Sequence, residues 1–200
     1  MNPRVVVVDH YDSYTWNLVH LVAAVTGELP AVVEHDQVEP DDLAGFSHVV
    51  LSPGPGHPAQ EHDFAVGRAL VLEASRPVLG VCLGMQGLVV AYGGVVAAVE
   101  PAHGEVASVR HVGSGPFRGI PSPFPAVRYH SLAAVDVPDE LEVLAVCDGV
   151  GAEVVMGVAP PPSSQNIRGL RAAASRNTST GSGPLTPSPG TSRPARDRAR

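Results

Sequence analysis

The sequence contains no lysine, so all 13 of its basic residues are arginines. It holds only two cysteines, Cys82 and Cys147, which are far apart in the chain. This spacing excludes a disulfide-rich scaffold and a metal site built on paired cysteines. No apolar run is long enough to cross a membrane, and no basic segment followed by an apolar one begins the chain. We therefore expect a cytoplasmic protein that does not associate with membranes.

The net charge of −7 is the sum of two unequal parts. Up to Val158 there are 6 arginines and 19 acidic residues, whereas residues 159–200 contain 7 arginines and one acid, Asp197. The acidic first part argues against nucleic-acid binding, and we expect residues 1–158 to form one folded domain. Residues 159–200 are rich in Pro, Ser, Gly and Ala without apolar periodicity, which predicts a disordered tail. The alternative for this segment is a basic tail that binds acidic partners.

Apolar runs and helical patterns alternate along the first half of the chain. The predicted strands are residues 4–9, 30–35, 48–52 and 77–81, and the predicted helices are residues 13–27, 64–74 and 82–92. This alternation predicts an α/β fold, in which a parallel sheet carries helices on both faces. After Gly93 only strand-like segments follow, at 95–100, 105–112, 124–135, 141–147 and 153–159. These predict a small antiparallel flank.

Sites in such sheets lie at the carboxyl ends of the strands, and two of these ends are unusual. The fourth strand runs into "GVCLG", residues 80–84, which has the form of a nucleophile elbow with small residues on both sides of Cys82. A helix beginning at Cys82 favours a thiolate, and the N–H of Leu83 faces the space where an oxyanion forms. The alternative is a buried cysteine at a glycine-flanked turn.

The third strand runs into "SPGPG", residues 52–56. Acyl transfer needs two donors on the oxyanion, and Pro55 has no N–H, so a donor from this loop is Gly54 or Gly56. A rigid turn without a ligand is the alternative. A phosphate-binding loop is disfavoured because no Gly-Lys-Ser/Thr follows.

Five segments in order carry a resemblance to a known family: "VDHYDSYTWNLVHLV", "VVLSPGPGHP", "PVLGVCLGMQGL", "AHGEVASVRHVGSGPFRGIPSPF" and "VRYHSL". Over residues 4–158 the chain resembles the class I glutamine amidotransferases. It is most similar to their chorismate branch, anthranilate synthase component II and the aminodeoxychorismate synthase glutaminase. The resemblance implies a parallel α/β fold without a cofactor. It also implies hydrolysis of L-glutamine, with the ammonia passed to a chorismate-binding synthase subunit. A hydrolase of the α/β-hydrolase type explains the elbow but not "PGPG" or "VRYHSL".

The resemblance also implies the roles of individual residues. Cys82 attacks the glutamine amide and forms a thioester, while Gly54 and Leu83 donate the oxyanion-hole N–H groups. Gln86 holds the amino-acid end of the substrate. The rest of the glutamine pocket is lined by Gly54, Pro55, Gly56, Ser131 and Leu132. From the residues alone, Ser131 can equally be a turn residue and Gln86 an exposed helix residue.

The chain departs from the family at the general base. The family requires a His and a Glu, in a His-Pro-Glu segment after a further strand, to deprotonate the cysteine. Residues 159–200 contain no histidine, and His57 and His130 are the histidines expected near the pocket. Two interpretations follow: an active glutaminase subunit, or an inactive module that binds only glutamine or the synthase. The absence of lysine indicates a GC-rich gene, so we also hypothesise that residues 159–200 are read out of frame.

Overall fold

The computed structural model describes residues 2–73 and 75–161, which lie within one compact unit, Met1–Ile167. The predicted disordered tail lies outside the described residues from position 162 onward. Within the described part of the chain, no helix is long and apolar enough to cross a membrane.

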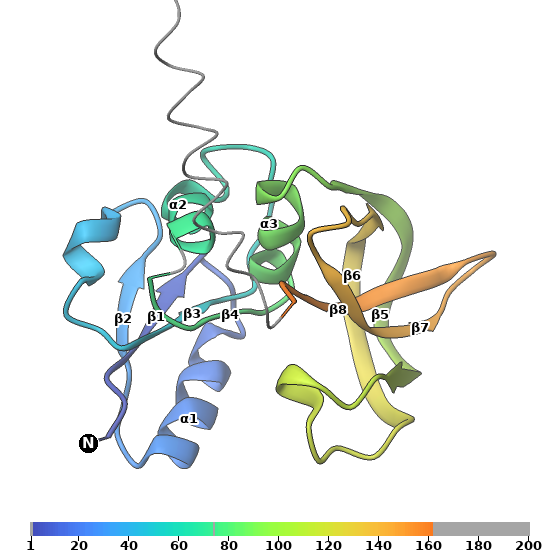
Figure 1. Ribbon diagram of the computed structural model, residues 1–200, viewed down its shortest axis with the longest axis horizontal. Helices are drawn as coiled ribbons and strands as arrows, with labels where there is room; N and C mark the ends of the chain where they lie inside the picture. The colour runs from blue at the N-terminus through green and yellow to red at the C-terminus, as the bar shows by residue number, and fades with distance from the viewer. Residues whose placement is uncertain (1, 74, 162–200) are drawn as a thin grey trace, which may run out of the picture. The chain divides into compact units, whose positions relative to one another are not determined.

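Four parallel strands form the first sheet, in the spatial order β2-β1-β3-β4 (Figure 1). Their bounds are β1 Val5–Asp9, β2 Ala31–Glu34, β3 His48–Leu51 and β4 Val78–Gly80. The two central strands, β1 and β3, are almost entirely apolar because helices cover both of their faces.

Helix α1 (Thr15–Thr26) covers one face of this sheet, and α2 (Ala65–Glu73) and α3 (Leu83–Ala91) cover the other (Figure 1). Alternate residues of β1 point to opposite faces, so Val7 packs with Val19 of α1. Val6 and Val8 belong to a second cluster, which contains Leu70 of α2 and Leu83 of α3. This arrangement confirms the predicted parallel sheet with helices on both faces.

An antiparallel sheet in the order β6-β5-β7-β8 forms the predicted flank. Its strands are β5 Val95–His111, β6 Phe124–Asp136, β7 Glu142–Asp148 and β8 Glu153–Ala159. Helix α3 packs against both sheets, because Val89 on it belongs to a core cluster with Val96, Ala134 and Leu141. Two short 3-10 helices, η1 Pro40–Leu43 and η2 Gly115–Phe117, complete the described elements.

Strand β5 corrects the prediction of two separate strands at 95–100 and 105–112. It is one strand of 17 residues, and its pairing with β6 shifts register between Ala98 and Ala102 and again between His103 and Glu105. Gly104, at φ +83°, adopts a conformation that favours glycine. The extra residues are therefore absorbed as bulges within the strand rather than as a turn between strands.

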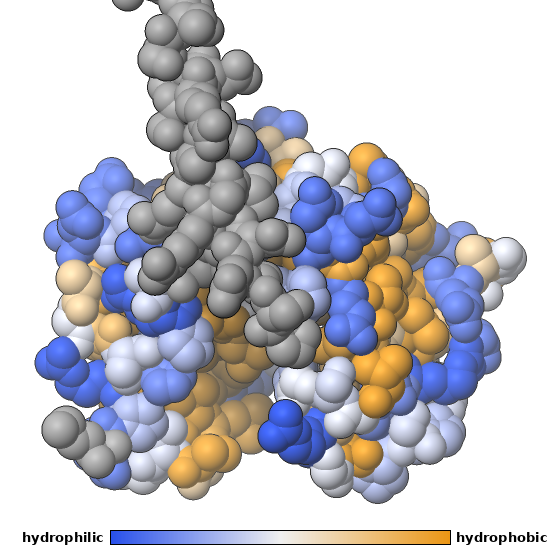
Figure 2. All heavy atoms as spheres, viewed as in Figure 1, coloured by the Kyte–Doolittle hydropathy of each residue, from blue (hydrophilic) through white to orange (hydrophobic). Residues whose placement is uncertain are grey.

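Helix α1 ends at Gly27, as predicted, but it begins at Thr15 rather than at residue 13. The N-cap is Tyr14, and Asp12 supports it by accepting the Tyr14 N–H at 2.8 Å. Trp16, Leu21 and Val25 are exposed, with Val25 at 87%, whereas Val19 is buried against the sheet. Figure 2 shows further hydrophobic surface over the antiparallel sheet.

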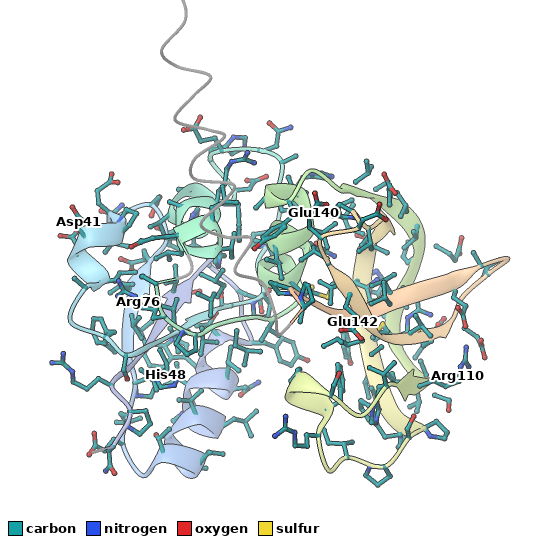
Figure 3. The ribbon with its side chains drawn as sticks, in the orientation of Figure 1. Asp41, His48, Arg76, Arg110, Glu140 and Glu142 are labelled. Atoms are coloured by element: carbon teal, nitrogen blue, oxygen red, sulfur yellow. The ribbon has the colours of Figure 1, made fainter. Side chains whose placement is uncertain are left out.

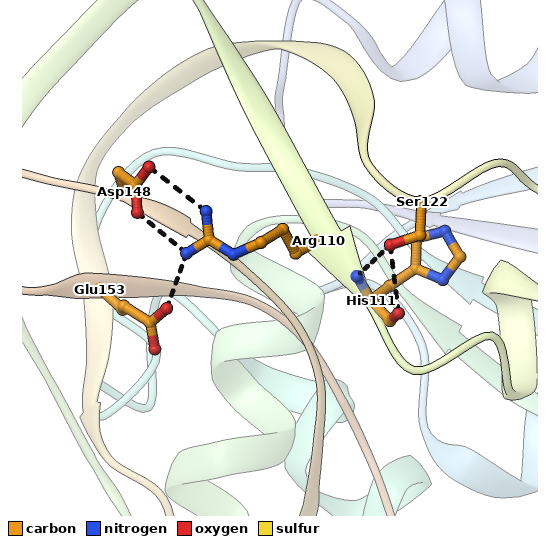
Figure 4. Close-up of polar contacts among 5 residues, drawn as sticks. All are labelled: Arg110, His111, Ser122, Asp148 and Glu153. Carbon is orange, nitrogen blue, oxygen red and sulfur yellow. Dashed lines mark hydrogen bonds and ion pairs between the residues drawn. The ribbon is translucent and has the colours of Figure 1, made fainter.

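Polar side chains tie neighbouring segments together. Arg110 on β5 forms ion pairs with Asp148 at 2.9 Å and Glu153 at 2.7 Å, which joins three strands (Figure 4). Next to it, the His111 N–H donates to Ser122 Oγ. In the α/β layer, Arg76 before β4 donates to the backbone oxygen of Leu43, the last residue of η1 (Figure 3).

Candidate active site

Cys82 lies at the sharp turn between β4 and α3, where the sequence predicts a nucleophile elbow. Its backbone has φ +52° and ψ −103°, and it is the N-cap of α3. A residue other than glycine in such a sparsely populated region costs about 1–3 kcal/mol. Neighbouring hydrogen bonds hold the turn, since the Val81 N–H donates to Leu51 O and the Gly84 N–H donates to Val81 O, both at 3.0 Å.

The glycines on either side of Cys82 are required by close packing. A Cβ atom added to Gly80 would lie 2.4 Å from the carbonyl carbon of Gly84. A Cβ on Gly84 would lie 2.7 Å from both Cβ and O of Leu51 on β3. The turn thus folds back directly onto the sheet, which leaves no space for a side chain at either position.

The glycine loop after β3 meets the first residue of α3. A Cβ atom on Gly54 would lie 2.6 Å from Cδ2 of Leu83 and 2.5 Å from Cβ of His10. The structure therefore brings together Gly54 and Leu83, the two predicted oxyanion-hole donors. Pro55 and Gly56 are exposed beyond them, and Gly56 has φ +86° with the carboxylate of Asp63 against it.

Behind this loop lies a buried pair that sequence reasoning missed. Ser52 Oγ accepts the His10 N–H at 2.9 Å and donates to Pro53 O at 2.6 Å, which fixes the entry into the glycine loop. The His10 ring is 1% exposed and stacks between His35 and Phe64. Burial and the nearby His35 lower the pKa of His10 to about 4, so the ring is neutral. The sequence signal that could have indicated this pair is the polar segment "DH", residues 9–10, which directly follows a run of four valines.

The other half of the predicted pocket lies on β6. Gln86, one turn beyond Cys82, donates from its side-chain amide to Leu132 O at 2.9 Å. Ser131 beside it is exposed. Helix α3 thus contacts both halves, with Leu83 against Gly54 and Gln86 against Leu132. Gln86 is 4% exposed, so its interpretation as an exposed helix residue is wrong.

The electrostatics at Cys82 differ from the expectation. Burial raises the pKa of the Cys82 thiol, the Leu83 N–H lowers it, and the Asp12 carboxylate raises it further. The net direction is upward, opposite to the expected effect of the helix N-terminus, because desolvation outweighs the hydrogen bond from the Leu83 N–H. The second cysteine, Cys147, is fully buried in β7. Within the described residues, no group of His, Cys, Asp or Glu side chains is arranged to hold a metal ion.

Neither histidine expected near the pocket is free to act as a base. His57 Nδ1 accepts the Ala59 N–H at 3.1 Å, so its Nε2 carries the proton and donates to Val96 O at 3.1 Å. His130 Nε2 accepts the Nε–H of Arg128 at 3.2 Å. Burial and the Arg128 cation lower the pKa of His130.

Comparisons with known proteins identify the family. The model of the family "Glutamine amidotransferase class-I" matches residues 6–164. Anthranilate synthase component 2 of Haloferax volcanii is 44% identical in an alignment of 163 residues that covers 78% of this chain and 80% of that protein. Aminodeoxychorismate synthase of Streptomyces griseus is 47% identical over 145 residues, 71% of this chain. This chain spans only 20% of the Streptomyces protein.

Solved structures support the same fold. A glutamine amidotransferase of Thermotoga maritima matches with a TM-score of 0.59 at 18% identity, over 72% of this chain and 67% of that chain. A Thermoplasma acidophilum protein described as one of the subunits of a GMP synthase matches with a TM-score of 0.70 at 18% identity. The match covers 90% of this chain and 99% of that chain. Because the family model matches most of this chain, the chain belongs to the class I glutamine amidotransferases.

Proposed function

We propose that this chain is the glutaminase part of a chorismate-using synthase, which makes anthranilate or 4-amino-4-deoxychorismate. The observation that carries the proposal is the positive φ of Cys82 at the start of α3, with the Gly54 loop packed on Leu83. This is the arrangement that a cysteine acyl-transfer site requires. The relatives named anthranilate synthase component 2 and aminodeoxychorismate synthase support the choice of pathway branch.

In the proposed reaction the Cys82 sulfur attacks the side-chain amide carbon of L-glutamine. The N–H groups of Gly54 and Leu83 stabilise the negative oxygen. Collapse of this intermediate breaks the carbon–nitrogen bond, and the proton lost by the thiol leaves on ammonia. Water then adds to the thioester, releases glutamate and restores the thiol.

Gln86 is suited to the amino-acid end of the substrate. Its amide nitrogen is used by Leu132, and among the described residues its amide oxygen has no hydrogen-bond partner. That oxygen is an acceptor for the substrate ammonium. The adjacent Ser131 and Leu132, with Gly54, Pro55 and Gly56, complete the proposed pocket.

The surface beside the site is suited to a partner subunit. In the segment "RYHS", Arg128 is buried and His130 half-buried, while Tyr129 and Ser131 are exposed. The Tyr129 ring lies 6.0 Å from that of Tyr14, which is also exposed. Exposed aromatic residues are enriched at protein interfaces. We therefore place the synthase contact at Tyr14 and Tyr129 rather than at Arg128 or His130.

A second candidate is a module that binds glutamine or the synthase without turnover. It is favoured by the raised pKa of Cys82 together with the engaged rings of His57 and His130. A positioned acid–base group contributes roughly 10²–10⁴-fold to such reactions. We propose that the 200-residue chain lacks this contribution, because no His-Pro-Glu occurs in it.

Labelling tests the site. A glutamine-analogue chloroketone is expected to modify Cys82, with protection by L-glutamine, and mass spectrometry locates the adduct. Labelling mainly at Cys147, or no protection by glutamine, contradicts the assignment.

Glutamate release tests the missing base. A variant in which an in-frame His-Pro-Glu segment of a relative replaces residues 159–200 is expected to hydrolyse glutamine roughly 10²–10⁴-fold faster than the chain itself. If the chain comes within about tenfold of that variant, below the range expected of a base, then His57 or His130 acts as the base and our site is wrong.

A further inference from the structure

Arg128 on β6 is a buried cation with few partners. Its side chain is 8% exposed. The Nε–H donates to His130, and Nη1 lies 4.0 Å from the Glu105 carboxylate, which is itself 66% exposed. Across residues 2–73 and 75–161, neither Nη atom of Arg128 donates a hydrogen bond. A buried charge is costly unless it is paired and hydrogen-bonded, and the Nη donors of this guanidinium are available to a further negative group.

A cavity of about 300 Å³ lies against Arg128. Strands β5 and β6 and the turn between β7 and β8 enclose it. Its volume is at the lower end of small-molecule sites, which measure about 300–1,000 Å³. None of its lining residues belongs to the proposed glutamine pocket.

The charges of the cavity restrict its ligand. Among the described residues, Arg128 is the one cationic residue that lines it, and the acidic ones are Glu100, Glu105 and Glu153. Glu153 is already paired with Arg110 at 2.7 Å (Figure 4). A simple anion would meet the remaining two carboxylates, and a simple cation would leave Arg128 unpaired. A small zwitterion satisfies both signs of charge.

The remaining walls are apolar. Val99, Ala133 and Val154 line the cavity, and the exposed Val150 stands at its rim. We propose that this cavity binds a free α-amino acid with an apolar side chain. Its carboxylate accepts from the Nη atoms of Arg128, its ammonium faces Glu100 and Glu105, and its side chain packs on the valines.

Three probes that share the isopropyl group but carry different charged groups test the ligand class. On the full chain, titration calorimetry is expected to show saturable millimolar binding of L-valine, undiminished by saturating L-glutamine. N-acetyl-L-valine lacks the ammonium and isobutylamine lacks the carboxylate, so each is expected to bind at least about tenfold more weakly, as for the loss of a charged hydrogen bond. The absence of millimolar L-valine binding, or N-acetyl-L-valine binding as tightly as L-valine, overturns the proposal.

Variants test the residues. Arg128→Gln and Glu105→Gln are each expected to weaken L-valine binding about tenfold or more, while Arg68→Gln on the exposed side of α2 leaves it unchanged. Circular dichroism and thermal unfolding report whether each variant folds. If Arg128→Gln does not fold, the test rests on the exposed Glu105, and Glu105→Gln has to weaken L-valine binding for the proposal to stand. Unchanged binding in the folded variants places the ligand elsewhere and overturns the site.

Discussion

The side-chain amide of Gln86 donates a hydrogen bond to the backbone oxygen of Leu132 at 2.9 Å. The donor lies on α3, whose N-cap is Cys82, and the acceptor lies on β6, 46 residues further along the chain. Since Gln86 is almost fully buried, this bond fixes the helix of the proposed nucleophile against the strand that carries Ser131.

Replacing Gln86 tests this connection. Gln86→Met keeps the volume but leaves Leu132 O without its donor, so we expect the free energy of unfolding to fall by about 1–3 kcal/mol. Labelling of Cys82 by the glutamine-analogue chloroketone is expected to slow, whereas labelling by iodoacetamide changes little. Gln37→Met at an exposed glutamine is the control and is expected to change neither. Equal slowing with both reagents would mean that Gln86 affects the thiol rather than the substrate.

Adding one methyl group to the glycine loop tests its packing. Gly54→Ala places a Cβ 2.5 Å from that of His10, so we expect a loss of stability of about 1–3 kcal/mol from overpacking. In Gly45→Ala the nearest atom is 3.8 Å away, and that variant is expected to be as stable as the parent. Urea unfolding measures both. Equal midpoints for the two variants would show that the loop is not packed as described.

The pH dependence of Cys82 alkylation tests the electrostatics. The Asp12 carboxylate opposes the negative thiolate, so Asp12→Asn is expected to lower the pKa of Cys82 and speed its reaction with iodoacetamide at pH 8. Asp41→Asn, in η1 of the α/β layer (Figure 3), is the control. A slower reaction in Asp12→Asn, with the fold intact, contradicts the predicted direction.

His10 is expected to make stability depend on acid. Its pKa is about 4 in the folded chain against an ordinary value of 6.5, so the unfolded chain binds the proton more readily between these values. The contribution of His10 to stability is therefore fully present above pH 6.5. Its loss lowers the free energy of unfolding by up to about 3 kcal/mol as the pH drops to about 4. His10→Phe retains a ring for the stack and removes this contribution. Urea unfolding at pH 7 and pH 5 is expected to show a smaller loss in the variant than in the parent, and parallel losses would assign the acid sensitivity to other groups.

The sequence by itself determined the α/β layer and the place of the proposed nucleophile. Apolar runs, helical spacing and glycine stops are local signals, and they located β1 to β4 and the end of α1 at Gly27. The elbow at Cys82 was also predictable, because its two flanking glycines, Gly80 and Gly84, lie within the same five consecutive residues as the cysteine.

Only the tertiary structure decided the features that depend on distant partners. Strand β5 is continuous because β6 pairs across its bulges, and Arg128 is buried because β6 turns that face inward. His10 reaches Ser52 across 42 residues, and Gln86 reaches Leu132 across 46. The upward shift of the Cys82 pKa likewise follows from burial and from Asp12, which lies 70 positions earlier in the chain. Desolvation and contacts of this kind arise only when the chain has folded. A local sequence pattern therefore does not determine these contacts or the direction of the pKa shift.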